Sequence, residues 1–166
     1  MTAQMKLSLC NEVLRHLDFE SQCRTAAALG YQGLELAPFT LADDPAQLRE
    51  ADAARLRKTA AQHGLAISSL HWLLVQPEGL SLSTPDAALH RRTVDFLAHL
   101  IAFAAACGAQ VLVHGSPQQR APAAGQSVAD ALARAAAGWM QLAVHAERAG
   151  VVYCIEPLSP AEPPGA

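Results

Sequence analysis

The stretch Leu29-Gly30-Tyr31-Gln32-Gly33-Leu34-Glu35-Leu36 passes from the end of a helical pattern, through a glycine, into a short apolar run. Glycine readily adopts the left-handed conformation that closes a helix and turns the chain into a strand. The same junction recurs at His63-Gly64-Leu65, Cys107-Gly108-Ala109 and Ala149-Gly150-Val151. This repeated helix–glycine–strand junction predicts a repeating α/β fold.

Apolar runs and amphipathic stretches alternate on both sides of these junctions. The runs are short and rich in Val, Ile and Leu, as the buried strands of a parallel sheet are. Their starts lie near residues 6, 33, 66, 110 and 151, a repeat of roughly 36 residues that suits a βα unit. The predicted strands are Lys6–Cys10, Gly33–Ala37, Ala66–Leu74, Gln110–His114 and Val151–Glu156, and the predicted helices are Asp18–Leu29, Pro45–His63, Asp86–Cys107 and Gln126–Ala149.

Two folds use this order of elements, namely an open doubly wound sheet and an eight-stranded (β/α)8 TIM barrel. No G-x-G-x-x-G follows any predicted strand, so the barrel is preferred, with all four helices on its outer face. A whole barrel takes ~250 residues, whereas this chain has 166 and supplies only about the first five strands and four helices. We therefore expect an incomplete barrel over residues 1–158, a loop or disordered tail over 159–166, and a chain truncated relative to the whole barrel.

Composition excludes several classes of protein. The chain is 51% hydrophobic and 16% charged. A disordered chain has a lower hydrophobic content and a higher net charge. Its formal net charge of −3 gives no basic footprint for nucleic acid, and no apolar run approaches the ~20 residues that cross a bilayer. Because the N-terminus also lacks a secretory signal, we expect a cytoplasmic protein. The four cysteines show no C-x-x-C spacing, which favours buried thiols over a zinc site or disulfides.

Polar residues at the carboxyl ends of the predicted strands are the first candidates for a site, because parallel βα folds bind ligands there. His71, His114 and Glu156 end three successive strands. Imidazole and carboxylate are ligands that divalent metals accept, although a histidine at such a position can equally be a hydrogen-bonded packing residue. We expect Glu35, His71, His114 and Glu156 to converge at one end of the sheet. Further candidates near the strand ends are Asn11, Glu12, His16, Trp72, Gln118 and Arg120.

At these residues the sequence resembles the xylose isomerase-like TIM barrels, the sugar phosphate isomerase/epimerase superfamily. Relatives in that superfamily include hydroxypyruvate isomerases, inosose dehydratases and apurinic endonucleases. The resemblance covers roughly residues 5 to 160 of the chain, which correspond to the N-terminal portion of the family's barrel. It depends on the segments Met5–Asn11, Leu29–Leu36, Leu70–Leu74, Val113–Pro117 and Ile155–Pro157.

The resemblance implies a metal-dependent isomerase or epimerase of carbohydrate metabolism that acts through an enediolate. A divalent metal (Mn²⁺, Mg²⁺, Co²⁺ or Zn²⁺) would bind two adjacent oxygens of a ketose, and a carboxylate would move the proton. Glu156 matches the family's first metal-ligating glutamate, which also serves as the catalytic acid/base. Glu35, His71, Trp72 and His114 match positions that bind substrate. The other metal ligands are expected on later strands, so we expect this chain to bind the metal weakly.

Two alternatives remain open beside a sugar or sugar phosphate isomerase. One is a zinc-dependent phosphodiesterase like the apurinic endonucleases, although the negative net charge of the chain does not suit DNA binding. The other is a non-catalytic, degenerate barrel. The expected partner is a small-molecule sugar, with no nucleic acid and no membrane. Because an incomplete barrel exposes sheet edges, we also expect a homo-oligomer.

Overall fold

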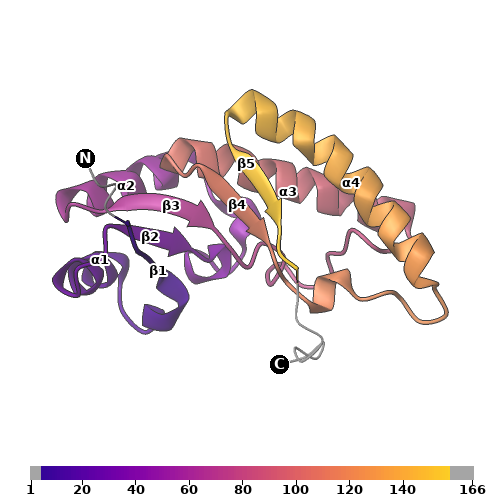
Figure 1. Cartoon of the computed structure of the whole chain (residues 1–166), viewed down its shortest axis with the longest axis horizontal. Helices are drawn as coiled ribbons and strands as arrows, with labels where there is room; N and C mark the ends of the chain where they lie inside the picture. The colour runs from indigo at the N-terminus through magenta and orange to yellow at the C-terminus, as the bar shows by residue number, and fades with distance from the viewer. Residues whose placement is uncertain (1–4, 158–166) are drawn as a thin grey trace.

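The computed structural model describes residues 5–157, which form one parallel sheet of five strands in the order β1-β2-β3-β4-β5 (Figure 1). Each strand pairs with the next one along the chain, and every pair is parallel. Neighbouring parallel strands need a crossover connection, and an α-helix supplies it between each of these four pairs. The strands are β1 (Ser8–Cys10), β2 (Gly33–Leu36), β3 (Ala66–Leu70), β4 (Val111–His114) and β5 (Val152–Ile155).

Four α-helices alternate with the strands, as the sequence predicts. They are α1 (Phe19–Ala28), α2 (Glu50–Gln62), α3 (Ala87–Cys107) and α4 (Val128–Ala149). The side chains of Asp18, Asp86 and Ser127 accept hydrogen bonds from the first turns of α1, α3 and α4. Gly108 and Gly150 close α3 and α4 in the left-handed conformation, with φ of 81° and 68°. The predicted helix–glycine–strand junctions are therefore present where the two long helices end.

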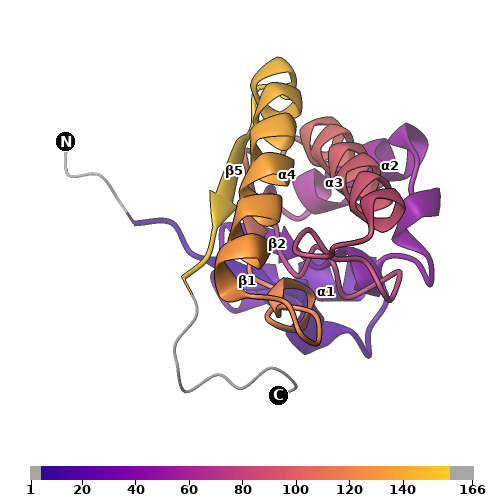
Figure 2. The ribbon, with the colours of Figure 1, turned by 90° about the vertical axis from the view of Figure 1, so that its right-hand side faces the viewer.

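The helices lie on one face of the sheet. Figure 2 shows α2, α3 and α4 side by side on the same side of the strands, and each helix packs against the next one along the chain. A doubly wound fold would place helices on both faces. The prediction of a barrel-type sheet with its helices outside is confirmed. We call the helix-covered side of the sheet the helix face and the opposite side the inner face.

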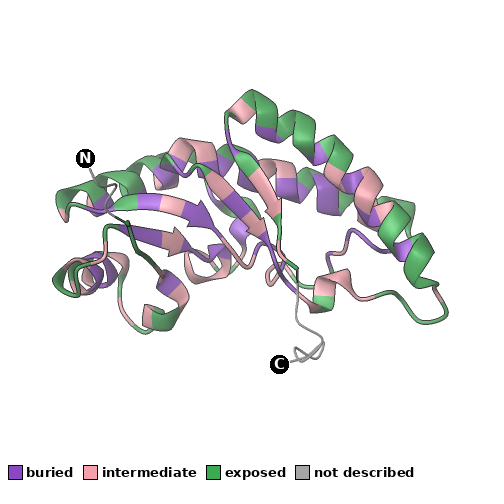
Figure 3. Cartoon of the chain, viewed as in Figure 1, coloured by how far each residue is buried: buried purple, intermediate pink, exposed green. Residues whose placement is uncertain are grey.

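The hydrophobic core fills the layer between the sheet and the helices. Leu34, Leu36, Leu70 and Leu112 point into it and are fully buried. Glu35, Val111 and Val113 alternate with these leucines, face the other way and are partly exposed, because successive strand side chains point to opposite faces. Figure 3 shows the buried positions along the strands and the exposed ones on the outer sides of the helices. The alternation therefore decides which strand-end residues reach the inner face.

Two element boundaries differ from the sequence prediction by more than two residues. The strand predicted over Ala66–Leu74 ends at Leu70, because the chain turns at Trp72, whose φ is +56°. The helix predicted from Pro45 begins at Glu50, because Leu48 and Arg49 are extended after a short 3₁₀ turn. The tail predicted over 159–166 lies outside the described residues. No helix within residues 5–157 is long and apolar enough to cross a membrane.

Candidate functional site

The inner face carries a hydrogen-bonded pair of polar side chains on β2 and β3. Glu35 is paired with Ser69 across these strands, and paired residues of neighbouring strands point to the same face. The Ser69 hydroxyl donates a 2.8 Å hydrogen bond to Oε1 of Glu35. This bond satisfies a half-buried carboxylate in the interior of the sheet. Glu35 therefore lies on the inner face, with one oxygen held by its neighbouring strand.

Glu156 and His71 meet above Gly115, at the carboxyl ends of β3, β4 and β5. A Cβ atom at Gly115 would overlap the carboxylate of Glu156 and would lie 3.3 Å from Cε1 of His71. The backbone N–H of Glu156 donates to the carbonyl of His114 at 3.2 Å, which continues the β4–β5 pairing by one residue. The absence of a side chain at Gly115 thus leaves the space that the carboxylate occupies. A carboxylate and an imidazole lie together on the inner face as a result.

Arg120 fixes the backbone beneath this pair. Its guanidinium donates from Nη1 to the carbonyl oxygen of Glu156 at 2.8 Å and from Nη2 to that of Gly115 at 3.4 Å. Partial burial lowers the pKa of Arg120, while the negative charge of Glu156 opposes that effect. The sequence suggested Arg120 as a candidate site residue near the end of a strand. In the structure this side chain instead joins the ends of β4 and β5.

His114 faces the opposite way. It is only 1% exposed, its Nδ1 lies 2.7 Å from the hydroxyl oxygen of Tyr153, and its ring meets Trp139 of α4 edge-on at 6.0 Å. Burial, helped by the positive charge of Arg120, lowers the pKa of His114 from 6.5 to about 4. Burial also raises the pKa of Tyr153. The structure brings Glu35, His71 and Glu156 to the inner face, but it places His114 on the helix face, so the expected convergence of all four does not hold.

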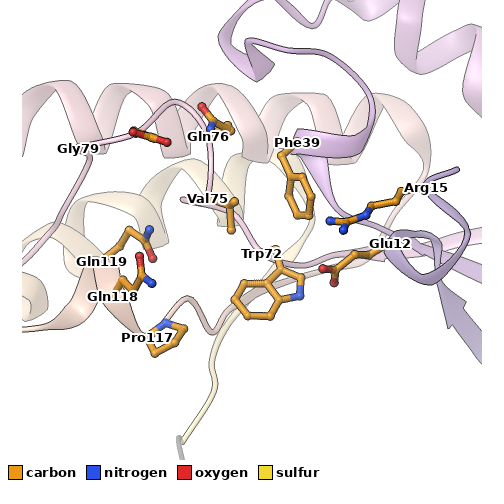
Figure 4. Close-up of a pocket in the computed structure, with 11 residues that line it drawn as sticks. Glu12, Arg15, Phe39, Trp72, Val75, Gln76, Gly79, Pro117, Gln118 and Gln119 are labelled. Carbon is orange, nitrogen blue, oxygen red and sulfur yellow. The ribbon is translucent and has the colours of Figure 1, made fainter. Parts of the chain in front are cut away.

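Trp72 stands between His71 and a polar cavity at the mouth of the site. Its indole meets the His71 imidazole edge-on, with ring centroids 5.2 Å apart. Figure 4 shows Trp72 with Glu12, Arg15 and Phe39 on one side and the loop after β4 on the other. This mouth cavity has a volume of about 530 Å³. The further lining residues include Val75, Gln76, Pro117, Gln118 and Gln119.

Sequence reasoning missed Arg15 and Phe39 and overrated two other residues. Phe39 comes three residues after the end of β2, in the turn Pro38–Thr40, so its place near a strand end was a usable signal. Asn11, a sequence candidate, is fully buried and binds the backbone N–H of Ala37 at 2.8 Å, so it holds the β1 and β2 ends together. His16, another candidate, is exposed and does not line the mouth cavity.

The side chains present do not complete a metal site. Within residues 5–157, no three His, Cys, Asp or Glu side chains lie close enough together to hold an ion. Glu156 and His71 would give one oxygen and one nitrogen, whereas such sites typically take three or more protein ligands. His114 cannot join His71 in a zinc cluster from the other face of the sheet. What the described residues offer is a carboxylate that can accept a proton and an imidazole beside it. All four cysteines are free, Cys23 and Cys107 being buried as predicted and Cys10 and Cys154 half-buried.

Residues 23–165 match the family described as xylose isomerase-like TIM barrel. No functionally curated protein shows significant sequence similarity to the chain.

Solved structures of sugar epimerases share the fold. A D-psicose 3-epimerase determined with D-fructose is 21% identical, with a TM-score of 0.74 over 94% of this chain and 53% of its own. The D-psicose 3-epimerase of Clostridium cellulolyticum H10 with D-tagatose is 17% identical, with a TM-score of 0.75 over 93% and 53%. The 3-keto-D-glucoside 4-epimerase of E. coli is 15% identical, with a TM-score of 0.74 over 94% and 57%. The chain spans about half the length of these structures, and at such identities the likeness shows the fold alone.

Proposed function

The chain belongs to the xylose isomerase-like TIM barrel family, and from this premise we propose that it acts as an isomerase or epimerase on a sugar or sugar phosphate. The observation that carries the proposal is the carboxylate of Glu156 beside His71 above Gly115. It lies on the inner face at the carboxyl ends of the strands, where enzymes built on this barrel hold their catalytic groups. The solved sugar epimerases that share the fold support the same class of reaction.

The proposed chemistry is a proton transfer next to a carbonyl. The Glu156 carboxylate accepts the proton from the carbon beside the substrate carbonyl, and the electron pair of that C–H bond forms the C=C bond of an enediolate. The carbonyl π electrons move onto oxygen, where an N–H of His71 donates a hydrogen bond. Returning the proton to the former carbonyl carbon, while the hydroxyl proton of the deprotonated carbon passes to the former carbonyl oxygen, completes an isomerisation. An epimerisation needs a second acid on the opposite side of the same carbon.

Trp72 and the mouth cavity orient the sugar in this proposal. The indole gives an apolar surface on which the C–H face of a sugar ring or chain can stack. Glu12, Arg15 and Gln118 surround the mouth with hydrogen-bonding groups for hydroxyls. The single positive charge of Arg15 among these residues suits either a hydroxyl or a terminal phosphate, so substrates of both kinds belong in the test.

A divalent metal (Mn²⁺, Mg²⁺, Co²⁺ or Zn²⁺) remains an expectation of the family resemblance. Because residues 5–157 do not form a metal site by themselves, the proposed proton transfer uses only the side chains of Glu156 and His71. Metal dependence is tested by running each assay below with and without each of these ions. A rate that does not respond to any of them would remove the metal from the proposal.

The experiment measures uptake of deuterium from D₂O at the carbons next to the carbonyl of a ketose, by NMR. The panel holds D-fructose, D-psicose, D-tagatose and L-ribulose with their phosphates, and the protein is made both as the 166-residue chain and from its complete natural reading frame. Glu156→Gln should lower the exchange rate about 10²–10⁴-fold while the circular dichroism spectrum is retained. Glu147→Gln on the exposed side of α4 is the matched control. An unchanged rate in Glu156→Gln, or no exchange with any ketose, would contradict the proposal.

A further inference from the structure

The mouth cavity beside Trp72 is distinct from the place where the proton moves. Its lining includes Trp72 but neither His71 nor Glu156, although the rings of His71 and Trp72 lie only 5.2 Å apart. Its volume of about 530 Å³ falls in the range of roughly 300–1,000 Å³ that small-molecule sites occupy. A ketose with its carbonyl at Glu156 and His71 therefore leaves room in the cavity for a further part of the substrate.

The backbone conformation at Trp72 joins the two places. Its φ of +56° is one that bulky residues rarely adopt, and such strained positions cluster at binding and active sites. His71 keeps its imidazole near the Glu156 carboxylate above Gly115, whereas Trp72 presents its indole to the mouth cavity (Figure 4). The group that meets the carbonyl and the surface that meets the rest of the substrate thus come from adjacent residues.

Two loops form the main walls of the mouth cavity, and hydrogen bonds hold them together. One loop follows β3 and the other follows β4. The Ser81 hydroxyl donates to the carbonyl of Gln119 at 2.9 Å, and the Ser83 hydroxyl donates to that of Ala121 at 3.0 Å. The cavity is therefore preformed, as most small-molecule sites are.

The lining suits a neutral ring that carries many hydroxyl groups. Trp72 and Phe39 offer aromatic surfaces against which the C–H groups of a sugar ring can pack. Carboxylates accept hydrogen bonds from hydroxyl groups, guanidinium groups donate to them, and amides do both. The polar side chains of the lining are those of Glu12, Arg15, Gln76, Glu78, Gln118 and Gln119.

The charges of the lining disfavour a phosphate. Glu12 and Glu78 supply two carboxylates, and Arg15 supplies one guanidinium. The only side-chain ion pair among residues 5–157 joins Arg55 to Asp52, so both carboxylates are free to accept hydrogen bonds from hydroxyl groups. A phosphate carries nearly two negative charges at pH 7 and would meet a lining with an excess of negative charge.

We propose that the mouth cavity binds a second, non-reacting sugar ring, so that the substrate is a ketose bearing a neutral glycosyl group rather than a sugar phosphate. The inference rests on the proposed function, because that function places the reacting ketose unit at Glu156 and His71. Binding energy from a remote part of a substrate can orient the reacting carbon and speed the reaction there. A glycosylated ketose should therefore react faster than the bare or the phosphorylated one.

The first test compares deuterium exchange from D₂O into D-fructose, fructose 6-phosphate and three glucosyl-fructoses. Turanose, maltulose and palatinose carry a glucose ring on three different oxygens of fructose. With the 166-residue chain and the product of the complete reading frame, kcat/KM for at least one of them should exceed that for D-fructose about tenfold. Exchange into D-fructose as fast as into all three, or fastest exchange into fructose 6-phosphate, would overturn the inference and leave the proposed reaction standing.

The second test measures binding without reaction. In ¹⁵N-labelled protein, Trp72 and Trp139 give the two indole N–H signals, which Trp72→Phe assigns. Methyl α-D-glucopyranoside has no carbonyl group and should move the Trp72 signal saturably, with a Kd on the order of 1 mM, and leave the Trp139 signal in place. A Trp72 signal that does not respond would overturn the inference. A response without exchange into any ketose would contradict the proposed reaction and still support a sugar-ring site in the cavity.

Two substitutions test the aromatic wall and the charge. Phe39→Ala should lower kcat/KM for the preferred glucosyl-fructose about fivefold more than for D-fructose. Glu78→Lys leaves one carboxylate against two cations in the lining and should raise kcat/KM for fructose 6-phosphate about tenfold. Glu147→Lys, on the exposed side of α4, changes the net charge equally and is the matched control. Equal effects of Phe39→Ala on both ketoses, or of the two lysine variants on the phosphate, would overturn the inference.

Discussion

Acidification should destabilise this protein through one buried histidine. His114 is held against Tyr153 and Trp139 on the helix face, and the positive charge of Arg120 acts on it. Burial and that charge lower its pKa from 6.5 to about 4. Between these two values the unfolded chain binds a proton at this residue and the folded protein does not. The free energy of unfolding therefore falls as the pH decreases from about 6.5 toward 4.

The size of the effect follows from the two pKa values. At pH 7 both states are almost entirely neutral at this residue, so it contributes little. At pH 5 the unfolded histidine is mostly protonated and the folded one mostly neutral, which costs about 2 kcal/mol of stability. Below pH 4 the loss levels off, because both states are then protonated. Typical domains have only ~5–15 kcal/mol of stability in total, so a loss of this size is readily measured.

The change in the free energy of unfolding is measured by urea unfolding at pH 7 and pH 5. The proteins compared are the wild type, His114→Gln and His145→Gln. Glutamine keeps an acceptor for the Tyr153 hydroxyl but cannot titrate. His145 is exposed on α4 and serves as the control. The wild type and His145→Gln should lose about 2 kcal/mol more between pH 7 and pH 5 than His114→Gln loses. If His114→Gln shows the same pH dependence as the wild type, His114 is not buried in its neutral form and the reasoning is refuted.

Two further substitutions test the fold and the site. Asn11→Ala removes hydrogen bonds to Ala37, Gln22 and Thr40 and leaves buried groups without partners, so unfolding in urea should show a loss of about 2–4 kcal/mol; a loss below ~1 kcal/mol would contradict the structural role of Asn11. Gly115→Ala should cost about 1 kcal/mol of stability or less, because the atoms in the way belong to the flexible end of Glu156 and, by a few tenths of an ångström, to the ring of His71. It should nevertheless lower deuterium exchange into a ketose about 10²-fold by displacing that carboxylate, and exchange at the wild-type rate would show that the carboxylate is not needed above Gly115.

The fold could be predicted from the sequence because its signals are local. A helix that ends in glycine and a strand that starts within a few residues constrain the chain over a short distance, and Gly108 and Gly150 adopt the expected left-handed conformation. The helix starts at Asp86 and Ser127 are equally local, since each side chain caps the turn that follows it. The turn at Trp72 was not predictable, because its positive φ falls within the segment Ala66–Leu74, which contains no glycine or proline.

The candidate site was only partly predictable, because position at a strand end does not decide which face a side chain occupies. His114 is the last residue of β4, whereas His71 and Glu156 each come one residue after their strands end. The register pairs Leu70 with Leu112 and His114 with Ile155. A difference of one residue turns a strand side chain to the opposite face. The nearly equal spacing of the three residues in the sequence conceals this difference, and only the register reveals it.

The pair His114-Gly115 consequently divides the end of β4 between two environments. His114 packs against Tyr153 and Trp139 on the helix face, and Gly115 leaves room on the inner face for the carboxylate of Glu156. Exchange of these two residue types would fill the space of the carboxylate and remove the hydrogen bond between His114 and Tyr153 at once. Because Trp139 lies beside His114 and Trp72 lies beside His71, the two indole N–H signals of a ¹⁵N-labelled sample report on the two faces separately. A sugar that binds on the inner face should therefore move the Trp72 signal and leave the Trp139 signal in place.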